Sequence, residues 1–153
     1  VNGVTSTKIL EITGGADFAE SFDIATSEKL IPGAVVSINP DNSGQLRVSD
    51  KAYDKSVAGI ISGAGGIQPG MLMGQEGTIA DGRYPVALTG RVYCLVDANH
   101  GEIVPGDLLT TSNTPGHAMK VSDHEQSRGA IIGKAMTSLK EGRGLVLLLV
   151  SLQ

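Results

Sequence analysis

The sequence contains no tryptophan, and aromatic residues make up only 3% of its 153 residues. So few aromatic side chains leave little for a stacking platform that would bind bases or sugars. Charged residues are also scarce, at 18%, against about 25% in an average domain. The net charge is −4 and the isoelectric point is near 5.3. Nucleic-acid binding requires clustered Lys and Arg side chains, so we expect no nucleic-acid partner.

Cysteine and long hydrophobic runs are nearly absent. Cys94 is the single cysteine, so no disulfide can form within the chain. It stands in a strand-like run, where we expect it to behave as a small buried hydrophobe. The longest apolar stretch, 145–150, is far shorter than the ~20 residues that a helix needs to cross a bilayer. We therefore expect no membrane insertion.

Glycine, in contrast, is abundant, with 21 residues. Turn signals such as Pro32-Gly33 and Pro105-Gly106 separate short apolar runs, which is typical of an all-β sandwich or barrel. No long window follows a helical period, and only one helical turn is expected, near 123–128. The expected strands lie near 7–12, 34–38, 45–49, 57–62, 70–73, 85–89, 91–97, 107–111, 117–121, 130–137 and 144–151.

An internal repeat links the two halves of the chain. Residues 31–36 (IPGAVV) resemble 104–109 (VPGDLL), and 46–50 (LRVSD) resemble 119–123 (MKVSD), with both matches 73 positions apart. Two copies are too few for a solenoid. The sequence therefore predicts an all-β fold, a compact barrel-like or sandwich domain with two pseudo-repeated halves and an N-terminal arm.

The domain organisation follows from the same pattern. The pseudo-repeat covers 31–62 and 104–137 within a single β domain over 23–153. Residues 1–22 are patterned differently, and we expect them to form an arm or linker that joins the domain to an upstream fibre or stalk segment of the same chain.

Several short motifs resemble one group of domains. These motifs are GADFAESF at 15–22, VAGIIS at 57–62, YPVALTGRV at 84–92 and GDLL at 106–109. In this order and spacing they resemble the C-terminal β-rich domains of phage neck-appendage and tail-fibre proteins and of related bacterial surface proteins. The resemblance covers about residues 14–152.

The resemblance implies a homotrimeric, extracellular, cell-surface or virion module. In the phage members the domain is an intramolecular chaperone that brings three chains into register and can then cut itself free. This chain lacks their aromatic-rich insert between the fifth and sixth strands, and its segment 63–66 (GAGG) is richer in glycine. No cleavage nucleophile can be carried over, so the catalytic residues are left unassigned.

Two acids in the first motif are candidates for such cleavage. Asp17 and Glu20 lie close to Ser21, where a pair of carboxylates could assist peptide-bond cleavage by general acid–base chemistry. The preferred interpretation is structural: Asp17 caps a turn next to Gly14-Gly15, and Glu20 pairs with a neighbouring basic group.

Three other groups invite functional readings that their spacing does not support. The acids and histidine at 97, 100, 102 and 107 could bind zinc or calcium, but their spacing fits no known motif, and His100-Gly101 reads first as a turn. Two further histidines, His117 and His124, stand alone in polar loops. Segment 63–70 lacks the Lys of a phosphate-binding loop and is expected to be a flexible or tightly packed loop. We expect no cofactor and no metal.

The run 145–150 (LVLLLV) is apolar at every position, whereas a half-buried strand would alternate. Either it lies centrally in the domain or it is covered at a subunit interface. We therefore expect a structural module that joins copies of this chain, as a trimer or a larger assembly, in a fibre, appendage or surface layer. Two alternatives are an autoproteolytic chaperone domain, whose only enzymatic activity would be on its own chain, and a receptor- or glycan-binding tip.

Overall fold

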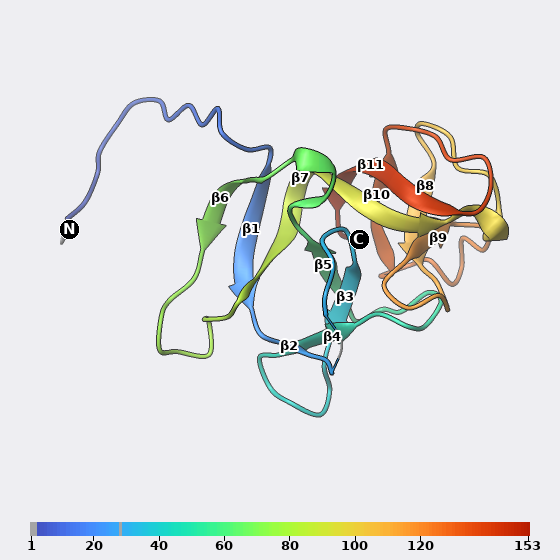
Figure 1. Ribbon diagram of the computed structural model, residues 1–153, viewed down its shortest axis with the longest axis horizontal. Helices are drawn as coiled ribbons and strands as arrows, with labels where there is room; N and C mark the ends of the chain where they lie inside the picture. Colours follow the sequence, from blue (N-terminus) through green and yellow to red (C-terminus); the bar gives the residue numbers. More distant parts are fainter. Residues whose placement is uncertain (1–2, 28) are drawn as a thin grey trace.

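The computed structural model describes residues 3–27 and 29–153, and over these residues the chain forms eleven β-strands and two short 3-10 helices (Figure 1). This confirms the all-β prediction. The elements are β1 (Asp17–Phe22), β2 (Ile24–Ala25), β3 (Val35–Ile38), β4 (Leu46–Val48), β5 (Val57–Ile61), η1 (Ala64–Gly66), β6 (Pro69–Met73), β7 (Tyr84–Asp97), η2 (Ala98–His100), β8 (Leu108–Thr111), β9 (Ala118–Lys120), β10 (Ile131–Ala135) and β11 (Arg143–Ser151).

The second half of the chain closes into a five-stranded barrel. The strand order β7-β9-β8-β10-β11 returns to its start because β11 also pairs with β7, from Arg143 opposite Asp97 to Ser151 opposite Thr89. Its interior is filled by side chains that are almost completely buried, among them Val92, Cys94, Val96, Leu109, Val146 and Leu148. Burial raises the pKa of the Cys94 thiol to about 12, so this cysteine is a core residue, as expected.

The first half repeats this arrangement on the other end of β7. Strand β5 pairs with β7, β3 with β5, β4 with β3, and β2 with β4. The ring closes because β1, one residue before β2, also pairs with β7. A second cluster of buried side chains fills this half: Ile24, Ala34, Val36, Leu46, Ile61 and Val86. The molecule therefore has two cores side by side. They share β7, and the larger core also includes Val35 of β3 and Ile60 of β5 from the first half.

The strands follow the 73-residue spacing of the internal repeat. Strand β8 starts 73 residues after β3, and the hairpins β3–β4 and β8–β9 are both antiparallel. The parallel contact of β2 with β4 also recurs, as that of β7 with β9. The halves differ between their last two strands, where residues 62–83 contain η1 and β6, and residues 136–142 contain no strand.

Strand β7 corrects one expectation. The sequence predicts two strands, 85–89 and 91–97, with a break at Gly90, but the structure has one continuous strand. Gly90 has φ +101°, and a Cβ on it would lie 2.9 Å from the Cα of Asp17. The glycine therefore bends the strand where β1 crosses it closely, without ending the strand.

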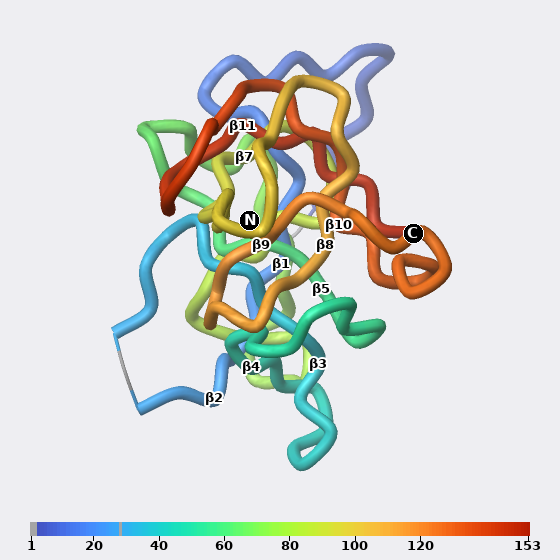
Figure 2. The backbone as a smooth tube through the Cα atoms, turned by 90° about the vertical axis from the view of Figure 1, so that its right-hand side faces the viewer, coloured from blue at the N-terminus to red at the C-terminus, as the bar shows by residue number. Residues whose placement is uncertain are grey.

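The N-terminal arm is shorter than the sequence predicts. Within the expected arm, 1–22, residues 17–22 form β1, which pairs with both β6 and β7. The expected strand 7–12 is not formed, and residues 3–12 are exposed. Figures 1 and 2 show the arm projecting beyond the body of the molecule. In Figure 2 the loop between β3 and β4 projects at the opposite end. Residues 1–2 lie outside the described part of the chain.

A tyrosine connects the two halves outside the sheet. Tyr53, in the loop between β4 and β5, has a left-handed backbone conformation with φ 54°. Its hydroxyl accepts hydrogen bonds from the backbone N–H groups of Ser122 and Asp123, at 3.1 and 3.0 Å. Its own N–H donates to the carbonyl oxygen of Thr111 at 3.3 Å. The β4–β5 loop of the first half is thereby attached to the second half. The expected helical turn near 123–128 is present as a single turn, which the hydrogen bond from the N–H of Ser127 to the carbonyl oxygen of Asp123 closes at 3.1 Å.

Candidate functional site

Strand β11 presents leucines to both sides. Val146, Leu148 and Val150 point into the barrel and are almost completely buried. The side chains between them point outward, and Leu145 and Leu149 are 41% and 45% exposed. The strand is thus central in its own barrel and also places leucines on the molecular surface, and the interpretation of the 145–150 run as part of a subunit interface stays a prediction.

Neighbouring strands extend this apolar surface. Leu95 and Tyr93 of β7 lie directly opposite Leu145 and Leu147 of β11. Such cross-strand neighbours lie on the same side of the sheet. The backbone N–H of Met136 donates to the carbonyl oxygen of Leu147 at 2.8 Å. We call the resulting surface the apolar face and define it by Tyr93, Leu95, Met136, Leu145, Leu147 and Leu149. Its inner border lies at Leu95, which also packs against the buried cluster of the first half.

The glycine-rich segment supports this face. Gly65 in η1 has φ +61°, and a Cβ on it would collide with the ring of Tyr93. The absence of a side chain thus lets the backbone of η1 lie against the ring. Gly66, in contrast, is exposed with no neighbour within 4 Å of an added Cβ, so the glycine-rich segment is closely packed at Gly65 and not throughout.

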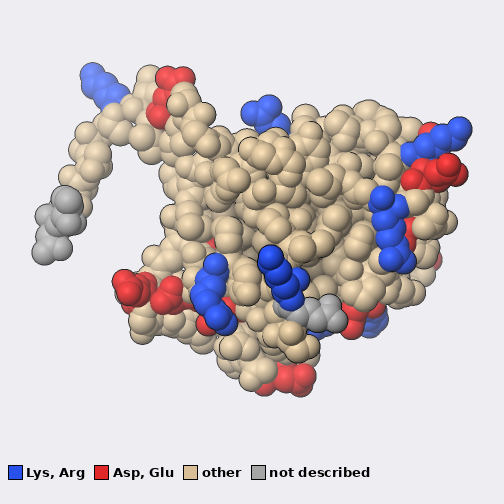
Figure 3. Space-filling model, in the orientation of Figure 1, with Lys and Arg blue, Asp and Glu red and all other residues tan. Residues whose placement is uncertain are grey.

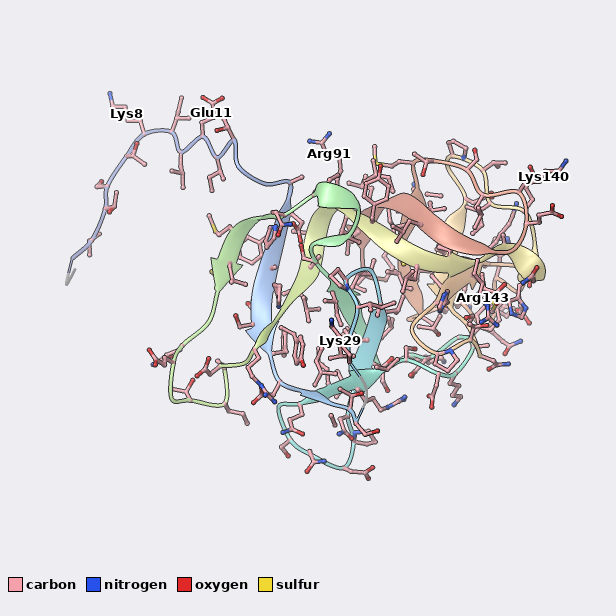
Figure 4. The ribbon with its side chains drawn as sticks, viewed as in Figure 1. Lys8, Glu11, Lys29, Arg91, Lys140 and Arg143 are labelled. Carbon is pink, nitrogen blue, oxygen red and sulfur yellow. The ribbon has the colours of Figure 1, made fainter. Side chains whose placement is uncertain are left out.

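Charged side chains border the apolar face, and Leu149 at one end of it lies directly between Arg91 of β7 and Lys134 of β10. In the space-filling view of Figure 3, the surface over β7 and β11 has no charged side chain in its middle, and the charged groups lie towards its margin. Figure 4 identifies marginal cations as Arg91, Lys140, Arg143 and, over the first half, Lys29. An apolar centre with a polar rim is the usual anatomy of a protein–protein interface.

The two acids considered for self-cleavage do not form a pair. Both stand on β1, and the burial alternation places Asp17 on the inward side and the half-buried Glu20 on the other. Asp17 is 4% exposed, and its carboxylate oxygens lack hydrogen-bond partners among the described residues. Burial raises the pKa of Asp17, although the neighbouring Ser62 hydroxyl acts in the opposite direction. The geometry gives this pair no common point of action on a peptide bond.

The acids of the 97–107 cluster serve separate local purposes. Asp97 accepts hydrogen bonds from the hydroxyl of Thr114 at 2.7 Å and from Nε of Arg143 at 3.2 Å. Nε2 of His100 lies 4.0 Å from the same carboxylate. Asp107, in contrast, forms an ion pair with Lys120 at 2.9 Å. Within residues 3–27 and 29–153, no three His, Cys, Asp or Glu side chains are grouped so that they could hold a metal ion.

The remaining histidines stay apart from these acids. Nδ1 of His117 lies 2.8 Å from the carbonyl oxygen of Pro115. The carbonyl oxygen of His124 accepts a hydrogen bond from the Ser127 hydroxyl within its own turn. Both interactions are local to the loops in which the histidines stand.

The sequence indicates only part of the apolar face. The run 145–150 is visible because every residue is apolar, but Tyr93, Leu95 and Met136 carry no such signal. They join the face only through the pairing of β7 with β11 and through the turn that follows β10. Only the register of β7 and of the turn after β10 against β11 shows that these three residues lie on the same side of the sheet as the leucines. The sequence does not give this register.

Comparisons with known proteins identify no relative. No family model matches the chain, and no curated protein sequence matches it significantly. In the described part of the chain, no helix has the length and apolar character to cross a membrane.

Proposed function

We propose that this chain is a self-association module that holds three copies together in an extracellular fibre, appendage or surface assembly. The observation that supports this most directly is the apolar face. Strand β11 already fills the barrel core with its inward side chains, and its other leucines point to solvent. Monomeric proteins rarely expose large contiguous apolar patches.

Covering this face would release apolar surface from water. Burying a fully exposed leucine contributes about 1.5–3 kcal/mol, so leucines that are 41% and 45% exposed would each contribute on the order of 1 kcal/mol. The same face on each copy would make this contribution in every subunit contact. The rim charges are then available to favour one orientation of the subunits over others.

The number of copies rests on the resemblance to phage appendage domains, which are trimers. A closed threefold arrangement buries the same surface on each chain and ends growth at three copies. Burying the apolar faces at a common axis would keep three chains in register, which is the role expected of such a module next to an upstream fibre segment.

The experiment is a measurement of native mass by light scattering over a dilution series. We expect a species of about 47 kDa, three times the 15.7 kDa chain mass. The double variant Leu145→Glu/Leu149→Glu should be monomeric, because it places two carboxylates within the apolar face. A matched control is Ile38→Glu, which replaces a 55% exposed residue on β3 in the other half, and it should keep the native mass.

Two results would contradict the proposal. One is a native chain that stays at 15.7 kDa at every concentration. The other is an oligomer whose mass is unchanged in Leu145→Glu/Leu149→Glu, which would move the contact away from the apolar face. Circular dichroism of each variant shows whether it retains the β fold.

A further inference from the structure

We propose that residues 8–12 of the arm bind as an added strand along the open edge of β6 in a second copy of the chain. This inference rests on the proposed self-association, but it concerns a different part of the molecule. The apolar face associates through side chains on closed barrels, whereas this contact would use backbone hydrogen bonds.

Strand β6 is an open edge. It pairs with β1 on one side, and on its other side it has no strand partner among the described residues. Such an edge presents a row of free N–H and C=O groups, and proteins usually protect it with charges, proline, bulges or a covering element. The start of β6 carries Pro69 and an irregular register opposite β1, but 71–73 pair regularly, contain no charged residue and leave Leu72 54% exposed.

The arm carries the pattern of a strand and pairs with no strand of the described chain. Residues 8–12 read KILEI, rich in β-branched and apolar residues, which favour strands. Leu10 is 66% exposed. Between residues 3 and 14, the hydrogen bond from the Thr7 hydroxyl to the carbonyl oxygen of Ile9 stays within the arm, and none joins it to the rest of the described chain. Figure 4 shows Lys8 and Glu11 pointing away from the body.

The arm lies next to β6, and both segments lack a counterpart in the second half of the chain. The arm leaves the body next to β6, because the N–H of Ala16 donates to the carbonyl oxygen of Gln68 at 3.0 Å. Neither the arm nor β6 has a counterpart in the second half of the chain. They are therefore additions to the repeated barrel plan, one an unpaired strand-like segment and the other an unpaired strand edge.

A second copy is the occupant that fits this geometry. In Figure 1 the arm runs outward from its own body, beyond β6, instead of lying along it. When copies assemble, an arm that points outward reaches the free edge of β6 in a neighbouring copy. Each copy then contributes residues 8–12 to one neighbour and accepts the same segment from a neighbour at its own β6. Strand addition of this kind obtains affinity from main-chain hydrogen bonds, and pockets for alternate side chains add specificity.

The test is disulfide trapping in the full chain. Leu10→Cys and Leu72→Cys chains, co-expressed with tags of different mass, are oxidised and separated without reductant. The native Cys94 is completely buried and does not interfere. We expect a Leu10→Cys chain joined to a Leu72→Cys chain. The matched control replaces Leu72→Cys with Lys140→Cys, at the far end of the molecule in Figure 4, and should give no such product.

A second variant pair tests the backbone contact. Leu10→Pro removes an N–H donor, whereas Leu10→Ala removes only the side chain. We expect the Leu10→Pro oligomer to dissociate at about tenfold higher concentration than the Leu10→Ala oligomer, because the proline variant loses one or two hydrogen bonds between chains. The arm is exposed in the single chain, so neither substitution should change the fold.

The outcomes separate the two proposals. An oligomer of about 47 kDa, three times 15.7 kDa, without the specific cross-link and with equal dilution curves for Leu10→Pro and Leu10→Ala, overturns the strand addition and leaves the self-association standing. A monomer that forms a disulfide only within a Leu10→Cys/Leu72→Cys chain overturns both, because the arm then covers its own β6.

Discussion

Nε of Arg143 donates a hydrogen bond to Oδ2 of Asp97 at 3.2 Å and so ties the first residue of β11 to the last residue of β7. The same carboxylate accepts hydrogen bonds from the Thr114 hydroxyl and from the backbone N–H of Asn99. Burial alone would raise the pKa of Asp97, but these hydrogen bonds outweigh burial and lower the pKa to about 2. One ionised side chain therefore holds together three segments at the end of the barrel.

Asp97→Asn should destabilise the fold by about 2 kcal/mol at pH 7, because it removes the charge from three hydrogen bonds at a buried site. The folded state lowers the pKa of Asp97 below its unfolded value of about 3.9. Its stabilising contribution is therefore complete above pH 4 and is lost as the pH falls towards 2. Urea unfolding at several pH values should show the difference between native chain and variant shrinking over this interval. Asp50→Asn, at a mostly exposed carboxylate, is the control, and an equal loss there would argue against the special role of Asp97.

Asp17→Asn is expected to have the opposite effect. The fold raises the pKa of Asp17, so the native state holds this proton more tightly than the unfolded chain does. Stability is therefore lost as the pH rises from the unfolded pKa through the folded one. A neutral amide removes this cost, and we expect the melting temperature at pH 7 to rise by about 2–4 °C for each kcal/mol recovered. A variant that melts lower at pH 7 but not at pH 3 would show that the carboxylate has a stabilising partner.

Tyr53→Phe removes the hydroxyl that accepts from Ser122 and Asp123. We expect a loss of about 1–2 kcal/mol in the free energy of unfolding, because two N–H groups lose their protein partner. Hydrogen exchange should accelerate at the amides of 122 and 123 and remain unchanged in β11. Uniform acceleration across both halves would mean that Tyr53 supports the whole fold and not the local junction.

Gly133→Ala tests the closure of the barrel. A Cβ at Gly133 in β10 would collide with the carbonyl oxygen of Leu149 in the adjacent strand β11. Backbone atoms cannot move aside as a flexible side chain can, so we expect a loss on the order of 2–3 kcal/mol and a lower melting temperature. Gly14→Ala, where the new Cβ would have no neighbour within 4 Å, is the matched control. Equal melting temperatures of the two variants would contradict the close approach.

Most strands of the two barrels can be predicted from the sequence, because the turns between them carry strong Pro, Gly and Asp signals. Strand β1 escapes prediction because its sequence, DFAESF, mixes a buried acid with half-buried polar residues and shows no regular alternation. Strand β2 has only two residues, too few for any pattern. Both are strands because of distant partners, β7 and β4, which local propensity cannot reveal.

The segment 7–12 shows the reverse situation. Its residues favour a strand, yet a strand requires a partner for its backbone groups, and residues 3–27 and 29–153 of the single chain provide none. The apolar face could be predicted only in part, because the side of the sheet on which a residue lies also depends on a strand partner. The run 145–150 indicates burial on both sides, but only the register Leu145 opposite Leu95 distinguishes the barrel interior from the outer surface.

The way β7 serves both barrels has a mechanical consequence. Its first part completes the first ring with β1 and β5, and its second part belongs to the next ring with β9 and β11. A continuous strand, and not a linker, therefore joins the two rings, so a displacement at one end of β7 would be transmitted along the strand to the other. We expect the two halves to move and unfold as one body.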